Sequence, residues 1–188
     1  VQTCALPIYL IHNMSEKRGY HRKEITAARN FAQAAKAAGV RRIIYLGGLG
    51  DPASDLAAHL QSRQDTGKEL SRHGVPVTEF RAAIIVGSGS MSFEMIRYLT
   101  ERLPIMICPR WVYQRVQPIA VGDVLSYLSQ ALNTPHSTGQ VIEIGGRDVL
   151  PYADMMKVYA QERGLKRWLI PVPVLTPGLS SHWVHWMT

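Results

Sequence analysis

Residues 39–50 read GVRRIIYLGGLG: a glycine and a valine, a continuous apolar run, and a glycine-rich turn. The preceding residues 21–38 carry apolar side chains at helical spacing, which predicts a helix that ends at Gly39. The same succession returns at Gly74, which follows Gly39 by 35 residues, and continues into the apolar run 77–86 that ends at Gly87. Apolar runs separated by helices are typical of parallel strands covered on both faces. The sequence therefore predicts a doubly wound α/β sheet.

The same patterns extend outward from this repeat. Short apolar runs predict strands at residues 9–12 and 141–144, and a single predicted strand covers 77–86. Helices are expected at residues 92–102, 124–132 and 152–163. Ser90 or Ser92 is expected to cap the first of these helices and Asp123 the second, because short polar side chains accept hydrogen bonds from free N–H groups at helix starts.

Composition narrows the class of protein. The chain has 188 residues, of which 46% are hydrophobic and 19% charged, enough for one core and too few for two large domains. No apolar run reaches the roughly 20 residues of a membrane helix, so no membrane span is expected. Its two cysteines, Cys4 and Cys108, form no disulfide framework, which favours a reducing compartment and a cytoplasmic location.

The formal net charge is +7, but Lys and Arg are scattered and form no tract longer than two. Nucleic-acid grooves usually show clustered basic residues with aromatic side chains between them. We therefore expect a solvated basic surface that faces a phosphate-bearing ligand, and no nucleic-acid partner.

Six stretches in order are informative about the family: His12, Ala27-Ala28-Arg29-Asn30, Ala37-Ala38-Gly39-Val40, Ile43-Ile44-Tyr45-Leu46, Arg81-Ala82-Ala83-Ile84-Ile85-Val86-Gly87 and Gln117-Pro118-Ile119-Ala120-Val121-Gly122-Asp123-Val124. Their order and spacing resemble the atypical short-chain dehydrogenase/reductases, and most closely the NmrA-like branch, over roughly residues 9–175. The resemblance implies an NAD(P)-binding Rossmann-type domain.

The resemblance places residues 9–12 on the family's fourth strand. We therefore expect the C-terminal part of a doubly wound parallel Rossmann-type sheet, without the first three strands and without the Gly-rich turn that holds the cofactor pyrophosphate. Residues 9–12 would then form an exposed apolar edge. The turn Gly48-Leu49-Gly50-Asp51-Pro52-Ala53 matches G-x-G-x-x-A but is rejected as that fingerprint, because Asp51 would bring a carboxylate against the pyrophosphate.

The two ends of the chain are expected to lie outside this domain. Residues 1–8 resemble a translated sequencing adapter and are interpreted as a non-native leader, although a short genuine strand lead-in is the alternative. Residues 9–175 form the partial NAD(P)-binding domain. Residues 176–188, with two tryptophans, are interpreted as the start of a missing C-terminal domain.

The expected catalytic residues are altered. Family enzymes carry Tyr-x-x-x-Lys on the helix after the fifth strand, where this chain has His59 and Arg63, and a serine where it has Gly47-Gly48. Residues four apart share a helix face, so His59 could transfer a proton while Arg63 holds ribose hydroxyls or a phosphate. An exposed polar helix face explains this pair equally well. Nothing replaces the serine hydroxyl unless Ser62, Ser88 or Tyr45 reaches the site.

The resemblance also implies a set of cofactor-binding residues. These are His12, Leu46, Gly47, Gly48, Ala82, Ala83 and Ile84. For His12 a satisfied buried histidine is the favoured alternative, and Gly47-Gly48 would let the backbone approach the nicotinamide closely. No Cys/His spacing indicates a metal.

These residues predict an NAD(P)-binding, oxidoreductase-like protein with a degenerate active site. The alternative is a non-catalytic, NmrA-like regulatory protein that senses the cofactor. The expected partners are a nicotinamide dinucleotide, NADP or NAD, an unidentified small-molecule substrate, and a second copy in a homodimer. We expect the full-length protein to bind the cofactor; the fragment alone need not bind it.

Overall fold

The computed structural model describes residues 6–11, 20–50 and 58–172. The chain divides into two units: unit 1 comprises Val1–Ala83 and Gly122–Gly145, and unit 2 comprises Ile84–Val121 and Gly146–Thr188. His12, most of the expected leader and the expected C-terminal segment 176–188 lie outside the described residues. Of the helices in the described ranges, none combines the length and apolar character needed to cross a membrane.

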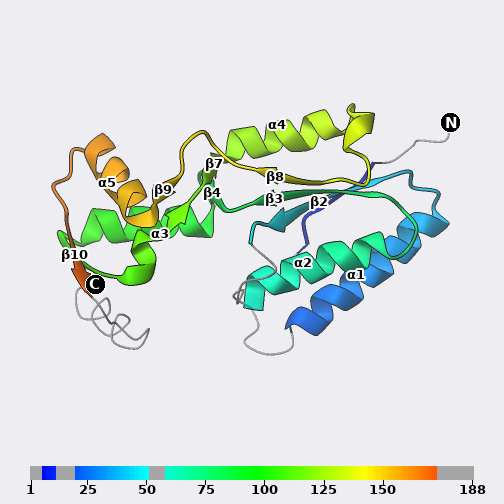
Figure 1. Ribbon diagram of the computed structural model, residues 1–188, viewed down its shortest axis with the longest axis horizontal. Helices are drawn as coiled ribbons and strands as arrows, with labels where there is room; N and C mark the ends of the chain where they lie inside the picture. The colour runs from blue at the N-terminus through cyan, green and yellow to red at the C-terminus, as the bar shows by residue number, and fades with distance from the viewer. Residues whose placement is uncertain (1–5, 12–19, 51–57, 173–188) are drawn as a thin grey trace. The chain divides into compact units, whose positions relative to one another are not determined.

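Unit 1 is built on a four-stranded parallel sheet with the order β1-β2-β3-β8 (Figure 1). The strands are β1 (Ile8–Tyr9), β2 (Ile43–Gly48), β3 (Val77–Ala82) and β8 (Val141–Ile144). Helices α1 (Tyr20–Ala37) and α2 (Ala58–Ser71) lie side by side on one face, and α4 (Val121–Ala131) lies on the other. The predicted doubly wound parallel α/β architecture is confirmed.

Helix α1 packs on the sheet through small side chains. Ala28, Ala32 and Ala35 are buried at helical spacing. The Tyr9 ring on β1 packs against Phe31, with 4.9 Å between ring centroids. The helix ends as its sequence predicts: Gly39 has a φ of +69°, and the N–H of Val40 donates to the carbonyl of Ala35 at 2.9 Å.

A buried arginine joins the start of β2 to the end of α4. The Arg42 guanidinium donates to the carbonyl oxygens of Ala131, Leu132 and Thr134 and to the hydroxyls of Ser137 and Thr138. Its positive charge lies where the helix leaves carbonyl oxygens unsatisfied, which stabilises both the charge and the helix end. A short 3-10 helix, η2 (Pro135–Ser137), follows there.

Strand β1 is shorter than expected and begins one residue earlier. It covers Ile8 and Tyr9, which pair with Ile44 and Tyr45, so Ile8 belongs to the strand rather than preceding it. Leu10 and Ile11 follow it with 51% and 61% of their surface exposed. Among the described strands, β1 pairs only with β2, so it forms one edge of the sheet and apolar side chains lie beside it.

The described part of unit 2 contains three two-stranded sheets, two α-helices and one 3-10 helix. Strands β4 (Ile84–Val86) and β7 (Pro118–Ala120) pair in parallel, as do β5 (Ile105–Pro109) and β10 (Trp168–Val172), whereas β6 (Arg115–Val116) and β9 (Leu150–Pro151) pair antiparallel. The helices are α3 (Met91–Arg102), α5 (Tyr152–Glu162) and the 3-10 helix η1 (Arg110–Tyr113). The core of unit 2 joins apolar residues of α3, β5 and α5, which include Ile96, Met106 and Met156, together with Leu103 at the end of α3.

Several local expectations are wrong. The single predicted strand 77–86 is two strands, because the chain leaves the β2–β3–β8 sheet at Ala83 and β4 pairs with β7 instead. Helix α4 begins at Val121, so Asp123 lies in its first turn and is not its cap. Ser90 occupies the N-cap position of α3, but its hydroxyl donates to the carbonyl of Ile85 at 2.5 Å and caps no N–H group.

Candidate functional site

The carboxyl ends of β2 and β3 form the candidate site. Parallel strands present their carboxyl ends at the same edge of a sheet, where ligands bind in doubly wound folds. Gly48 pairs with Ala82 in register, and the N–H of Leu49 donates to the Ala82 carbonyl at 2.8 Å. The structure brings five of the predicted cofactor-binding residues together there: Leu46, Gly47, Gly48, Ala82 and Ala83. Ile84 begins β4 of unit 2, and His12 is outside the described residues.

Gly47 and Gly48 serve internal packing. A Cβ on Gly48 would lie 2.9 Å from Cδ2 of Leu60 and 3.2 Å from Cδ of Arg63, both on α2. A Cβ on Gly47 would lie 2.9 Å from Oε1 of Glu79. The space beside these glycines is therefore occupied by the protein's own side chains: Gly48 allows α2 to approach the sheet closely, and Gly47 makes room for the Glu79 side chain of β3.

The two predicted catalytic residues lie on α2. The side chain of Arg63 reaches across to Gly48 at the end of β2, which places it beside the candidate site. His59 lies in the first turn of α2, and its side chain is outside what the structure describes. The partnership between His59 and Arg63 therefore stays a prediction.

Two hydroxyls that could have replaced the expected serine are engaged in internal hydrogen bonds. The Tyr45 hydroxyl donates to the carbonyl of Arg63 at 2.8 Å. Burial, reinforced by the nearby Glu79 carboxylate, raises the pKa of Tyr45 above its usual value, so its phenol keeps its proton. Ser62 is buried and its hydroxyl donates to the Glu24 carboxylate on α1. Neither hydroxyl is placed to polarise a substrate oxygen.

A buried ion pair on β3 was missed by the sequence analysis. Glu79 is buried, and the Nε–H of Arg81 donates to its Oε1 at 2.8 Å. The carboxylate fills a cradle between Gly47 on β2 and Gly67 on α2, where a Cβ on Gly67 would lie 2.5 Å from Oε2. Two signals could have indicated it: charged residues two apart in an otherwise apolar strand, and a glycine inside a helix.

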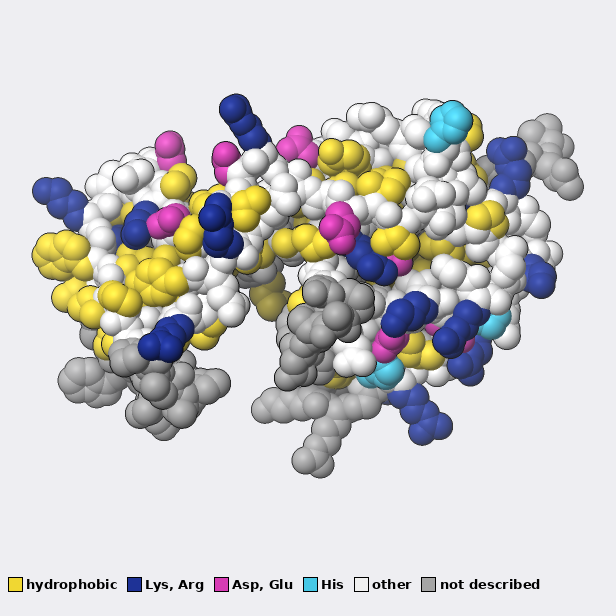
Figure 2. Space-filling view, in the orientation of Figure 1, with side chains coloured by type: hydrophobic (Ala, Val, Ile, Leu, Met, Phe, Trp, Pro, Cys, Tyr) yellow, Lys and Arg dark blue, Asp and Glu magenta, His cyan; other side chains and the backbone are white. Residues whose placement is uncertain are grey.

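Charges on the outer surface of α1 and α2 are mixed. Figure 2 shows acidic side chains between the basic ones over these helices, and ion pairs such as Arg29–Glu69 and Lys68–Asp65 join them. Across the described part of the chain, no group of three or more His, Cys, Asp or Glu side chains is placed to bind a metal ion.

Comparisons with known proteins add information about the fold. No protein-family model matches the chain, and no curated protein sequence matches it. Solved structures do match. The Bordetella bronchiseptica enzyme WbmG in complex with NAD has a TM-score of 0.73 and 17% identity over 93% of this chain and 64% of its own. A Citrobacter sp. triphenylmethane reductase has a TM-score of 0.73 and 15% identity over 97% of this chain and 60% of its own.

A nucleoside-diphosphate-sugar epimerase from Staphylococcus aureus is also similar, with a TM-score of 0.70 and 19% identity over 90% of this chain and 57% of its own. This chain spans between 57% and 64% of the length of these three solved proteins. Its own described part holds the parallel sheet with helices on both faces. The chain therefore has the Rossmann-like α/β fold that these epimerase and reductase structures share.

Proposed function

We propose that the chain is part of an NAD(P)-binding, oxidoreductase-like protein of the atypical short-chain dehydrogenase/reductase family with a degenerate active site. The observation that carries this proposal is the parallel sheet of unit 1, whose strands β2 and β3 end side by side and are packed against α2. The likeness to WbmG, a structure that contains NAD, supports it. So does the resemblance of the sequence to the NmrA-like branch.

The residues at these strand ends suit the nicotinamide and ribose part of a dinucleotide. Leu46 and Ala83 are apolar and partly exposed, so they could pack against a flat ring. Arg63 lies beside Gly48 and could donate to ribose hydroxyls or to a phosphate. When bound, the cofactor would supply the hydride, and these side chains would bind and orient it.

A specific observation favours the alternative function, a non-catalytic protein that senses the cofactor. Reduction of a carbonyl needs a group that gives a proton to the substrate oxygen. Tyr45 and Ser62 use their hydroxyls in internal hydrogen bonds, so an enzyme would depend on His59 as the proton donor, and Ser88 is the remaining candidate for the serine role. The substrate, the choice between NADP and NAD, a homodimer and a cytoplasmic location remain predictions for the whole protein.

Calorimetric titration of the full-length protein that contains this chain with NADH and NADPH tests the proposal. Saturable binding is expected, and Arg63→Gln should weaken it, whereas Lys68→Gln, on an exposed part of the same helix, should not. Absence of binding to the folded full-length protein would refute the proposal.

Turnover separates the two functions. NADPH oxidation with aldehydes, ketones or quinones that is lost in His59→Ala would support the enzyme. Cofactor binding without turnover, unchanged in His59→Ala, would support the sensor.

A further inference from the structure

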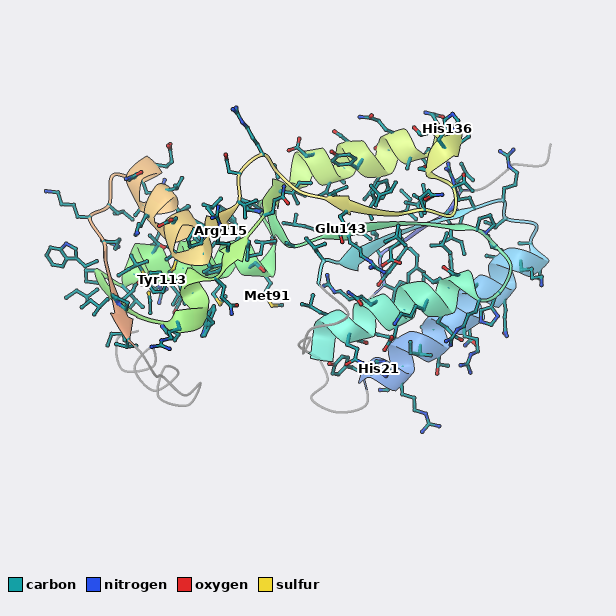
Figure 3. All side chains as sticks on the ribbon, in the orientation of Figure 1. His21, Met91, Tyr113, Arg115, His136 and Glu143 are labelled. Atoms are coloured by element: carbon teal, nitrogen blue, oxygen red, sulfur yellow. The ribbon has the colours of Figure 1, made fainter. Side chains whose placement is uncertain are left out.

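Two charged side chains of unit 1 stand next to each other near the carboxyl ends of β3 and β8. Arg81 pairs in register with Glu143, so the two side chains project from the same face of neighbouring strands, which are about 4.8 Å apart. Gly47 pairs with Arg81 from the other side, so this row also contains the glycine at the position of the expected serine. Figure 3 shows Glu143 on β8.

The Glu79 carboxylate fixes the orientation of the Arg81 guanidinium. Its Nε–H donates to Glu79, and the Glu79 carboxylate is buried between Gly47 and Gly67. The Arg81 side chain is 17% exposed, so little freedom remains to it. Within the described ranges, no hydrogen bond uses its two terminal amino groups. Arg81 therefore holds two amino groups in a fixed place, where they could donate to a ligand.

Glu143 presents acceptors beside these donors. Its side chain is exposed, and within the part of the chain that the structure describes no ion pair within 4.0 Å joins it to Arg81 or to another cation. A second carboxylate, Glu79, already faces the same guanidinium. Two negative charges around one positive charge do not favour an anionic ligand group, but they suit a neutral group that both accepts and donates hydrogen bonds.

We propose that Arg81 and Glu143 together bind a carboxamide of the ligand, with Arg81 donating to its oxygen and Glu143 accepting from its amino group. The proposal rests on the proposed function, because the nicotinamide ring of the cofactor carries one carboxamide. Each of the two residues is the second-to-last residue of its strand. Both therefore lie close to the carboxyl ends of the strands, where doubly wound sheets bind their ligands. Glu79 acts as a positioning residue, since it fixes the guanidinium without reaching the surface.

Calorimetry with two dinucleotides tests the contact with Glu143. NAD carries the carboxamide, and 3-acetylpyridine adenine dinucleotide has a methyl group in place of the amino group but the same charge. Glu143→Met should weaken NAD about tenfold, as expected for loss of a hydrogen bond to a charged acceptor, and should change the affinity for the analogue less than about twofold. Asp123→Asn, which removes an exposed charge on α4, should leave the ratio of the two affinities unchanged.

Glu143 is exposed, so the variant is expected to fold, which circular dichroism checks. Equal weakening of both dinucleotides, no weakening of either, or a wild-type protein that binds the two equally well would overturn the carboxamide contact while leaving cofactor binding intact. A folded wild-type protein that binds neither dinucleotide would refute the proposed function, and the carboxamide contact with it.

Discussion

Gly67 lies inside α2, where alanine would ordinarily be the better residue. Replacing an interior helix glycine with alanine usually stabilises a protein by up to about 1 kcal/mol. Here the new Cβ would lie 2.5 Å from Oε2, 2.9 Å from Cδ and 3.1 Å from Oε1 of Glu79. We therefore predict that Gly67→Ala destabilises unit 1, against its helix propensity.

The size of the effect follows from what must move. Glu79 is buried, held by Arg81 on one side and pressed against Gly47 on the other, so its carboxylate has no room to retreat. Overpacking of this kind costs up to about 3 kcal/mol. After the gain in helix propensity is subtracted, a net loss of about 2 kcal/mol remains. If the ion pair breaks, the loss rises further, because an unpaired buried charge costs about 3 kcal/mol or more.

Urea unfolding followed by far-ultraviolet circular dichroism measures this loss. Gly122→Ala is the matched control: Gly122 also lies in a helix of unit 1, but no atom lies within 4 Å of its added Cβ, so this change should be neutral or stabilising. If Gly67→Ala is as stabilising as Gly122→Ala, the carboxylate is not confined between the two glycines, and the account of the cradle is wrong.

Three further predictions concern other parts of the chain. Arg42→Ala should lower the free energy of unfolding by about 3 kcal/mol in urea titrations, because it leaves several carbonyl oxygens at the end of α4 unsatisfied. A loss below about 1 kcal/mol would contradict the role of Arg42 in stabilising this helix end. Thr100→Val should be neutral or stabilise unit 2 by up to about 1 kcal/mol, since the fully buried Thr100 hydroxyl has no hydrogen-bond partner within the described ranges, and clear destabilisation would show that it has one. Hydrogen bonds chiefly from Arg29, and also from His73 and Arg72, lower the pKa of Glu69 from 4.5 to about 2. Because the pKa of Glu69 is lower in the folded protein, Glu69 stabilises the fold fully above about pH 4.5, and this contribution is lost as the pH falls toward 2. Glu69→Gln should therefore flatten the dependence of the free energy of unfolding on pH in that window. An unchanged pH dependence would refute the pairing.

Helices, strands and helix ends that depend on residues close together in the sequence were predictable. Helix α1, its end at Gly39 and strand β8 lie within a residue of their expected bounds. Helical spacing and a glycine at positive φ act over a few residues, so the sequence carries them directly. The apolar run 77–86 shows the limit of this reasoning: it indicates a buried strand, but nothing in it marks Ala83 as the point where one sheet ends and another begins.

The sequence predicted where in the sheet the candidate site lies, but not the side-chain contacts within it. The glycine turn after β2 located the carboxyl edge of the sheet, because ligands and glycine turns gather there in doubly wound folds. The packing of side chains against Gly47 and Gly48 was not predictable from the sequence, since those side chains come from α2 and β3. The approach of a nicotinamide to these glycines stays a prediction. The pairing of Arg81 with Glu143 crosses 62 residues and appears only when β8 takes its place beside β3.

The sequence by itself determined the alternation of helices and parallel strands, because burial periods and glycine stops are local properties of the chain. The tertiary structure alone decided which strands became neighbours, which hydroxyls were consumed by internal hydrogen bonds, and which charges were brought into one row. Those outcomes depend on contacts between distant residues, and such contacts exist only after the chain has closed its loops and packed α2 onto the sheet.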